Sequence, residues 1–99
     1  MKSGYLYIII NKAFPDWVKI GTTSNLNERL SVYQTGDPFR AYKVVYSLQH
    51  PKYKEAEKKI KETMKMFALD IKNEWYNVDL GIAKSRLDEQ LEEYSNKTA

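Results

Sequence analysis

The chain has 99 residues, of which 42% are hydrophobic and 29% charged, and a net charge of +3. This composition indicates one globular domain and excludes collagen-like, low-complexity and disordered proteins. The absence of Cys excludes disulfides, thiolate metal sites and cysteine nucleophiles, and a single histidine, His50, excludes a multi-histidine metal site. We expect an intracellular protein, because the longest apolar run, Tyr5–Ile10, is too short to span a bilayer and no signal peptide precedes it.

The first half of the chain predicts a hairpin followed by a helix. Tyr5–Ile10 is aromatic and β-branched, which indicates a central strand buried on both faces. Turn residues follow it, and Trp17–Gly21 is predicted as a second strand paired with the first. A helix over Asn25–Gln34 is expected next, because Asn25 with Glu28 imitates a capping box. The apolar stripe of this helix is Leu26, Leu30 and Tyr33.

The second half predicts a third strand and two more helices. The strand is Ala41–Leu48, and a helix over Pro51–Met66 begins with Pro at its first position. Glu74–Val78 is predicted as a short extended piece, and a last helix covers Ile82–Tyr94. The predicted buried stripes are Tyr53, Ala56, Ile60, Met64 and Phe67 in the second helix, and Ile82 or Ala83, Leu87, Leu91 and Tyr94 in the last.

These elements predict an α+β fold, with a small three-stranded antiparallel sheet flanked by helices. We expect one domain over residues 1–95 and a frayed C-terminal tail over residues 96–99.

Charge is distributed unevenly along the chain. Residues 1–65 contain twelve Lys and Arg against six Asp and Glu, whereas residues 66–99 contain four against seven. A basic surface favours a polyanionic partner such as nucleic acid, although a lysine-rich helix is often simply a solvated face.

Four short motifs together resemble the GIY-YIG nuclease domain. They are Gly4-Tyr5-Leu6-Tyr7, then Lys19-Ile20-Gly21, then Arg29 eight residues after that glycine, and finally Glu74-Trp75-Tyr76. The resemblance extends from Tyr5 to about Val78 and is closest to a small branch with Y-x-Y, K-I-G and E-W-[FY] motifs. No single motif is specific, but their combination in this order is. The resemblance implies a three-stranded antiparallel sheet with flanking helices and a phosphodiester-cleaving endonuclease.

The resemblance also implies roles for individual residues. Tyr7, Lys19, Arg29 and Tyr33 correspond to catalytic positions, and Glu74 corresponds to the metal-binding glutamate. Glu57 corresponds to an acidic position common in this branch and is a secondary candidate. Two positions depart from the pattern: Lys19 replaces the usual tyrosine of the second motif, and Lys61 replaces a histidine often found after Glu57.

The chemistry of phosphodiester hydrolysis explains these residue types. A carboxylate such as Glu74 can hold Mg²⁺, or another divalent cation such as Mn²⁺, that polarises the phosphate. Arg29 presents a permanently charged fork that fits phosphate oxygens. Tyr7 or Lys19 could take a proton from the attacking water if its pKa were lowered, and the sequence does not decide between them.

DNA is the expected partner, and its phosphate backbone would be held by lysines that do not read bases. The predicted DNA-binding lysines are Lys43, Lys54, Lys58, Lys61 and Lys65. Specificity for sequence, and the choice between DNA and RNA, are left open, and a second copy or a partner protein could supply specificity. Two alternatives remain. One is a related module that binds nucleic acid without cutting it, and the other is an interaction or inhibitor protein that uses its acidic last helix.

Overall fold

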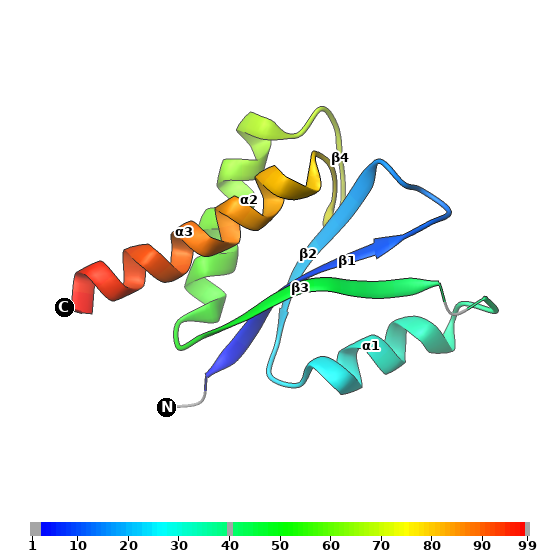
Figure 1. Ribbon diagram of the computed structural model, residues 1–99, viewed down its shortest axis with the longest axis horizontal. Helices are drawn as coiled ribbons and strands as arrows, with labels where there is room; N and C mark the ends of the chain where they lie inside the picture. Colours follow the sequence, from blue (N-terminus) through cyan, green and yellow to red (C-terminus); the bar gives the residue numbers. More distant parts are fainter. Residues whose placement is uncertain (1–2, 40, 99) are drawn as a thin grey trace.

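The computed structural model describes residues 3–39 and 41–98 as a sheet with helices on both sides (Figure 1). In chain order its elements are β1 (Gly4–Asn11), β2 (Trp17–Thr23), α1 (Leu26–Thr35), β3 (Tyr42–His50), α2 (Tyr53–Phe67), β4 (Ile71–Lys72), β5 (Trp75–Asn77) and α3 (Leu80–Thr98). The predicted α+β class, its first three strands and its three helices are confirmed. None of the helices in the described residues is long and apolar enough to cross a membrane.

The sheet is antiparallel with the strand order β3-β1-β2-β5-β4, so β1 lies at its centre, as predicted. Tyr7 of β1 pairs with Gly21 of β2 on one side and with Ser47 of β3 on the other. The expectation of three strands is wrong, because β5 pairs with β2 and β4 pairs with β5 to give five. Strand β5 lies within the extended piece predicted at Glu74–Val78, whereas β4 has two residues, too few to show the alternation that marks a strand in a sequence.

The hydrophobic core lies between one face of the sheet and the helices α2 and α3. Its buried side chains are Leu6, Ile8, Val18, Ile20, Ala56, Ile60, Met64, Tyr76, Val78, Ala83 and Leu87. Helix α1 lies on the other side of the sheet and has no buried residue (Figure 1). One face of the sheet therefore builds the core, and the other carries polar and aromatic groups under a loosely packed helix.

Two helix starts test the capping predictions. Asn25 caps α1 as expected, because its side-chain oxygen accepts a hydrogen bond from the Glu28 N–H at 3.1 Å. Helix α2 begins at Tyr53 rather than at Pro51, since β3 continues to His50 and residues 51–52 form a turn. His50 stabilises this turn by accepting a hydrogen bond from the Lys52 N–H at 2.9 Å.

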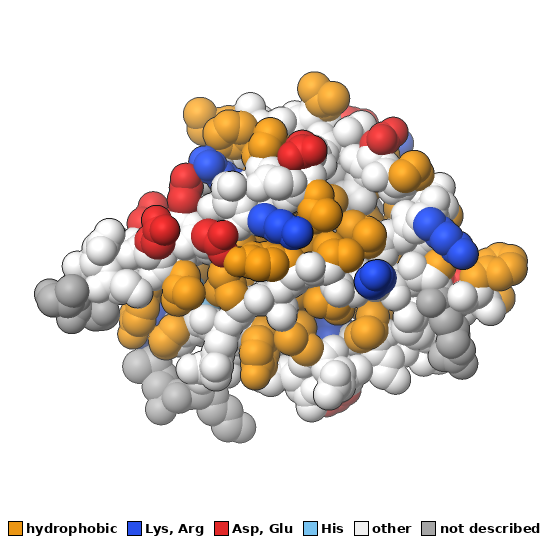
Figure 2. All heavy atoms as spheres, in the orientation of Figure 1, with side chains coloured by type: hydrophobic (Ala, Val, Ile, Leu, Met, Phe, Trp, Pro, Cys, Tyr) orange, Lys and Arg blue, Asp and Glu red, His pale blue; other side chains and the backbone are white. Residues whose placement is uncertain are grey.

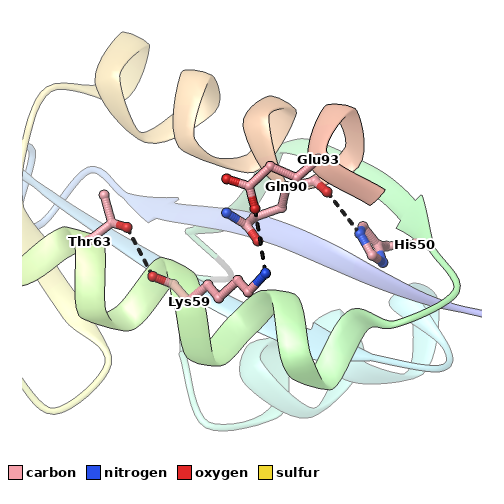
Figure 3. Close-up of polar contacts among 5 residues, drawn as sticks. All are labelled: His50, Lys59, Thr63, Gln90 and Glu93. Carbon is pink, nitrogen blue, oxygen red and sulfur yellow. Dashed lines mark hydrogen bonds and ion pairs between the residues drawn. The ribbon is translucent and has the colours of Figure 1, made fainter. Parts of the chain in front are cut away.

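Polar contacts join α2 to α3 beside that turn (Figure 3). The buried imidazole of His50 places Nε2 3.1 Å from the Gln90 carbonyl oxygen, and Lys59 forms an ion pair with Glu93 at 3.5 Å. Since His50 Nδ1 accepts the Lys52 N–H, Nε2 carries the proton and donates it to Gln90. The last helix is thus fixed to the end of β3 as well as to α2.

The predicted apolar stripes of α2 and α3 are wrong at their margins. Ala56, Ile60 and Met64 are buried, whereas Phe67 is 42% exposed. In α3 the buried residues include Ala83, Leu87 and Gln90. Ile82 and Leu91 are partly exposed, so the face of α3 that packs on the core passes through Ala83 and Gln90 rather than through these two larger apolar residues. The helix also continues to Thr98, past the predicted end at Tyr94, and Ala99 of the predicted tail lies outside the described residues.

Acidic side chains gather over α3 on the face shown in Figure 2. This helix carries the acidic run Asp88, Glu89, Glu92 and Glu93. The lysines of α2 and this acidic helix give the molecule two surfaces of opposite charge.

Candidate functional site

The face of the sheet that points away from the core carries the predicted site. Side chains alternate between faces along a strand, and directly paired residues share a face. Tyr7 pairs with Gly21, and Lys19 pairs with Trp75, so these residues lie on one face of β1, β2 and β5. Leu6, Ile8 and Ile20 occupy the core face of the same strands.

A close approach explains why glycine stands at position 21. A Cβ atom there would lie 2.5 Å from the phenol oxygen of Tyr7 and 2.7 Å from its Cζ atom. The Tyr7 side chain is buried, with 2% of its surface exposed. Gly21 therefore leaves the space in which the Tyr7 phenol lies across β2.

Helix α1 adds Tyr33 and Arg29 to this face. The Lys19 ammonium lies 4.9 Å from the centre of the Tyr33 ring, and Tyr33 is close enough to Tyr7 to raise the pKa of its phenol. Arg29 is exposed one helical turn earlier, and its charge acts on the Tyr7 phenol. The four predicted catalytic residues thus lie on the side of the sheet where α1 lies, near the middle of β1 and β2.

Glu74 reaches the same place from the turn between β4 and β5. Its carboxylate forms ion pairs with Lys19 of β2 at 3.3 Å and with Lys61 of α2 at 3.5 Å. Its carbonyl oxygen accepts a hydrogen bond from the Ile20 N–H at 3.4 Å, which ties the turn to β2. We call the set Tyr7, Lys19, Arg29, Tyr33, Lys61 and Glu74 the polar cluster.

Both candidate bases of the polar cluster hold their protons firmly. Burial raises the pKa of Tyr7 well above its usual range, hydrogen bonding to Tyr33 and the charge of Glu74 raise it further, and Arg29 opposes them. Burial lowers the pKa of Lys19, but its contacts with Tyr33 and Glu74 outweigh burial and raise the value. In this state the phenol is neutral and the ammonium is charged, so neither group is ready to accept a proton.

The donor set of the cluster fits a magnesium ion that is bound mostly by water and substrate. Within residues 3–39 and 41–98, no three His, Asp or Glu residues are placed to hold a metal together. Glu74 offers one carboxylate whose side chain is 44% exposed. Magnesium is commonly bound by one or two carboxylates together with waters and phosphate oxygens, so Glu74 alone suits that mode. Lys61, also partly exposed, can turn away from the carboxylate.

Glu57 lies on α2 one turn before Lys61 and is half-buried. Its charge and that of Glu74 act on Tyr76, whose pKa is raised chiefly by burial and then by these two carboxylates. The structure therefore places Glu57 and Glu74 near the same phenol, that of Tyr76.

The predicted DNA-binding lysines divide into two groups. Lys54, Lys58 and Lys65 are exposed and lie within one helical stripe around Lys61, whose direction is fixed by its ion pair with Glu74. Lys43 is exposed on β3, where it pairs with Ile10, a residue packed on the core side. Lys54, Lys58 and Lys65 thus share the stripe of α2 that carries Lys61, and Lys43 lies on the face of the sheet opposite to Tyr7 and Lys19.

Two aromatic rings lie beside the cluster: Tyr42, which was not singled out from the sequence, and Trp75, which was named there only as part of a motif. The Tyr42 ring lies 5.4 Å from the Tyr33 ring and 6.3 Å from the Trp75 ring, measured between centroids. Alternation along β3 could have indicated which face of the sheet Tyr42 lies on. However, the pairing between β1 and β3 shifts register before it reaches Tyr42 and Asn11, and no sequence pattern marks that shift.

Comparison with known protein families identifies the family of the chain. A family model for the T5orf172 domain matches residues 4–95, which includes every member of the polar cluster. The chain belongs to the T5orf172 domain family. The T5orf172 domain is related to the GIY-YIG domains, so the resemblance seen in the sequence is confirmed at this broader level. No significant match was found among curated proteins or among solved structures.

Proposed function

We propose that this T5orf172 domain is a magnesium-dependent endonuclease that hydrolyses phosphodiester bonds of DNA. The observation that supports the proposal best is the convergence of Tyr7, Lys19, Tyr33 and Glu74. These residues come from β1, β2, α1 and the β4–β5 turn, yet they contact one another through the ion pair and ring contacts described above. A purely structural role does not require a buried phenol, two ammonium groups and a carboxylate in one cluster.

Each member of the cluster has a chemical task in this proposal. Glu74 would hold the divalent cation, which, when bound, polarises the phosphate and stabilises the leaving oxygen. Arg29 is exposed at the rim and donates hydrogen bonds to the phosphoryl oxygens. Lys61, displaced from Glu74, supplies a second positive charge to the same phosphate. Tyr33 orients Lys19 and Tyr7 by contacting both.

The identity of the group that accepts the proton of the attacking water stays open between Tyr7 and Lys19. Either must first lose the proton that it holds in the free protein. The variants Tyr7→Phe and Lys19→Met keep most of each side chain's bulk and remove its titratable group. The variant that removes the true base should lose cleavage more completely than the other.

A second candidate function is DNA binding without cleavage. It is favoured by the firmly held protons of Tyr7 and Lys19 and by the pairing of Glu74 with two ammonium groups. In that case the cluster would be a rigid cationic platform for a phosphate.

Cleavage and binding assays on the same DNA separate these functions. Plasmid and branched DNA would be incubated with the protein in Mg²⁺ or EDTA, and mobility shifts would be measured in parallel. Nicking that requires Mg²⁺ supports the endonuclease. Salt-sensitive binding without nicking supports the binding module. A protein that neither binds nor nicks DNA would contradict both functions.

A further inference from the structure

An aromatic hollow lies beside the polar cluster and takes no part in the chemistry proposed above. It has a volume of about 310 Å³ and is lined by Phe14, Trp17, Lys72, Asn73 and Trp75. Phe14 and Trp75 meet edge to face with their ring centroids 5.0 Å apart, and the Lys72 ammonium lies 5.6 Å from the Trp17 ring. The walls are half-buried aromatic rings, and the exposed Lys72 side chain borders the opening.

The hollow is directly connected to the cluster. Asn73 and Glu74 form the short turn between β4 and β5, and Asn73 adopts a left-handed conformation with a φ of 57°. This turn presents Glu74 to Lys19 and is followed at once by Trp75, which pairs with Lys19 across the sheet. The same turn therefore determines the position of the Glu74 carboxylate in the cluster and of the Trp75 ring in the wall of the hollow.

We propose that this hollow holds an unpaired base of the DNA strand that is cut, next to the phosphate bound at the cluster. The proposal rests on the proposed function and narrows its substrate to DNA with unpaired nucleotides. Nucleobases stack on aromatic side chains whatever their sequence, and a nearby cation attracts the backbone phosphate. The volume lies at the lower end of the range for small-ligand sites, as expected for a single flat base in an open hollow.

The charges around the hollow favour a nucleotide over an apolar protein segment. Lys72 borders it directly, and Lys19 pairs across the sheet with Trp75, one of its walls. An apolar peptide would offer no counter-charge to Lys72, whereas a nucleotide offers a ring to Trp17 and Trp75 and a phosphate to the lysine.

Fluorescence provides a direct test, because Trp17 and Trp75 are the two tryptophans of the chain and both line the hollow. The full chain in EDTA would be titrated with a short oligothymidylate and with an abasic oligonucleotide of equal length and charge. We expect the oligothymidylate to quench the fluorescence and to bind about tenfold more tightly than the abasic strand. Equal affinities, or no binding of either strand, would overturn the proposal.

Variants locate the effect within the hollow. Trp17→Ala should abolish the preference for oligothymidylate, whereas Trp17→Phe keeps a ring and should retain most of it. Phe67→Ala, which removes a partly exposed ring elsewhere on the molecule, should leave the preference unchanged. An unaltered preference in a folded Trp17→Ala protein would contradict the assignment, and the wild-type comparison remains decisive if that variant does not fold.

The outcome is independent of catalysis. Preferential binding of oligothymidylate without any nicking of DNA would support the hollow as a base site and reject the endonuclease. Nicking without this preference would support the endonuclease and reject the base site.

Discussion

Replacing Gly21 by Ala should disturb the protein more than its small size suggests. The new Cβ would lie 2.5 Å from the Tyr7 phenol oxygen and 2.7 Å from Cζ, closer than real Cβ contacts come. The phenol cannot move away freely, because Tyr7 is only 2% exposed on the central strand. Overpacking of this kind costs about 1–3 kcal/mol of unfolding free energy. Urea unfolding followed by tryptophan fluorescence measures the loss, and cleavage should fall with it because the phenol is displaced.

Two further variants separate the clash from a general cost of removing glycine. Gly36→Ala is the matched control, since no atom lies within 4 Å of a Cβ at that position, and we expect a change below about 0.5 kcal/mol. Tyr7→Phe removes the atom nearest to the new Cβ. The double variant with Gly21→Ala should therefore be less destabilised than the sum of the single variants, by about 0.5 kcal/mol or more. Strict additivity, or a Gly21→Ala protein as stable as wild type, would refute the close-approach argument.

Three other predictions concern the rate of cleavage, the binding of DNA and the stability at low pH. Arg29→Ala should slow cleavage on the order of 10²-fold or more, while the melting temperature stays near wild type because the side chain is exposed. Replacing Lys54 and Lys58 together by Ala should weaken binding to unrelated DNA sequences equally and reduce the logarithmic salt slope by roughly 1.8, whereas Lys59→Ala, on the side of α2 facing α3, should not. The Asp37 carboxylate accepts hydrogen bonds from two backbone N–H groups, which lower its pKa below the unfolded value. Its stabilising effect is therefore complete above the unfolded pKa and is lost as pH falls through the folded pKa. Asp37→Asn should lower the melting temperature at neutral pH. In strong acid the melting temperatures of the variant and the wild type should lie closer together, and calorimetry can measure both.

The parts of the fold that the sequence predicted are those with long, regular patterns. Tyr5–Ile10 is apolar throughout because β1 has neighbours on both edges and is covered on both faces. The start of α2 was misplaced because Pro51 suits both a first helical position and a turn, and the pairing of His50 with Gly4 selects the turn. That pairing is a contact between distant residues, which local pattern cannot reveal.

In the candidate site, too, local sequence patterns predict some features, and contacts between distant residues determine the others. Alternation along β1 and β2 is sufficient to place Tyr7, Lys19 and Gly21 on one face once the hairpin is assumed. The ion pair between Lys61 and Glu74 was not predicted, because it depends on how α2 packs over the sheet and on a turn flanked by very short strands. Lys61 in the structure pairs with the carboxylate of Glu74, and its role in DNA binding stays a prediction.

Cleavage by Glu74→Gln tests the central proposal most directly. The amide keeps the size of the side chain and removes the charge that would bind Mg²⁺, and the group is partly exposed, so folding should persist. Glu62→Gln, an exposed change on α2, is the matched control. The account predicts that Mg²⁺-dependent nicking is abolished in Glu74→Gln and retained in Glu62→Gln, with DNA binding nearly intact in both. Wild-type nicking by a folded Glu74→Gln protein would contradict it.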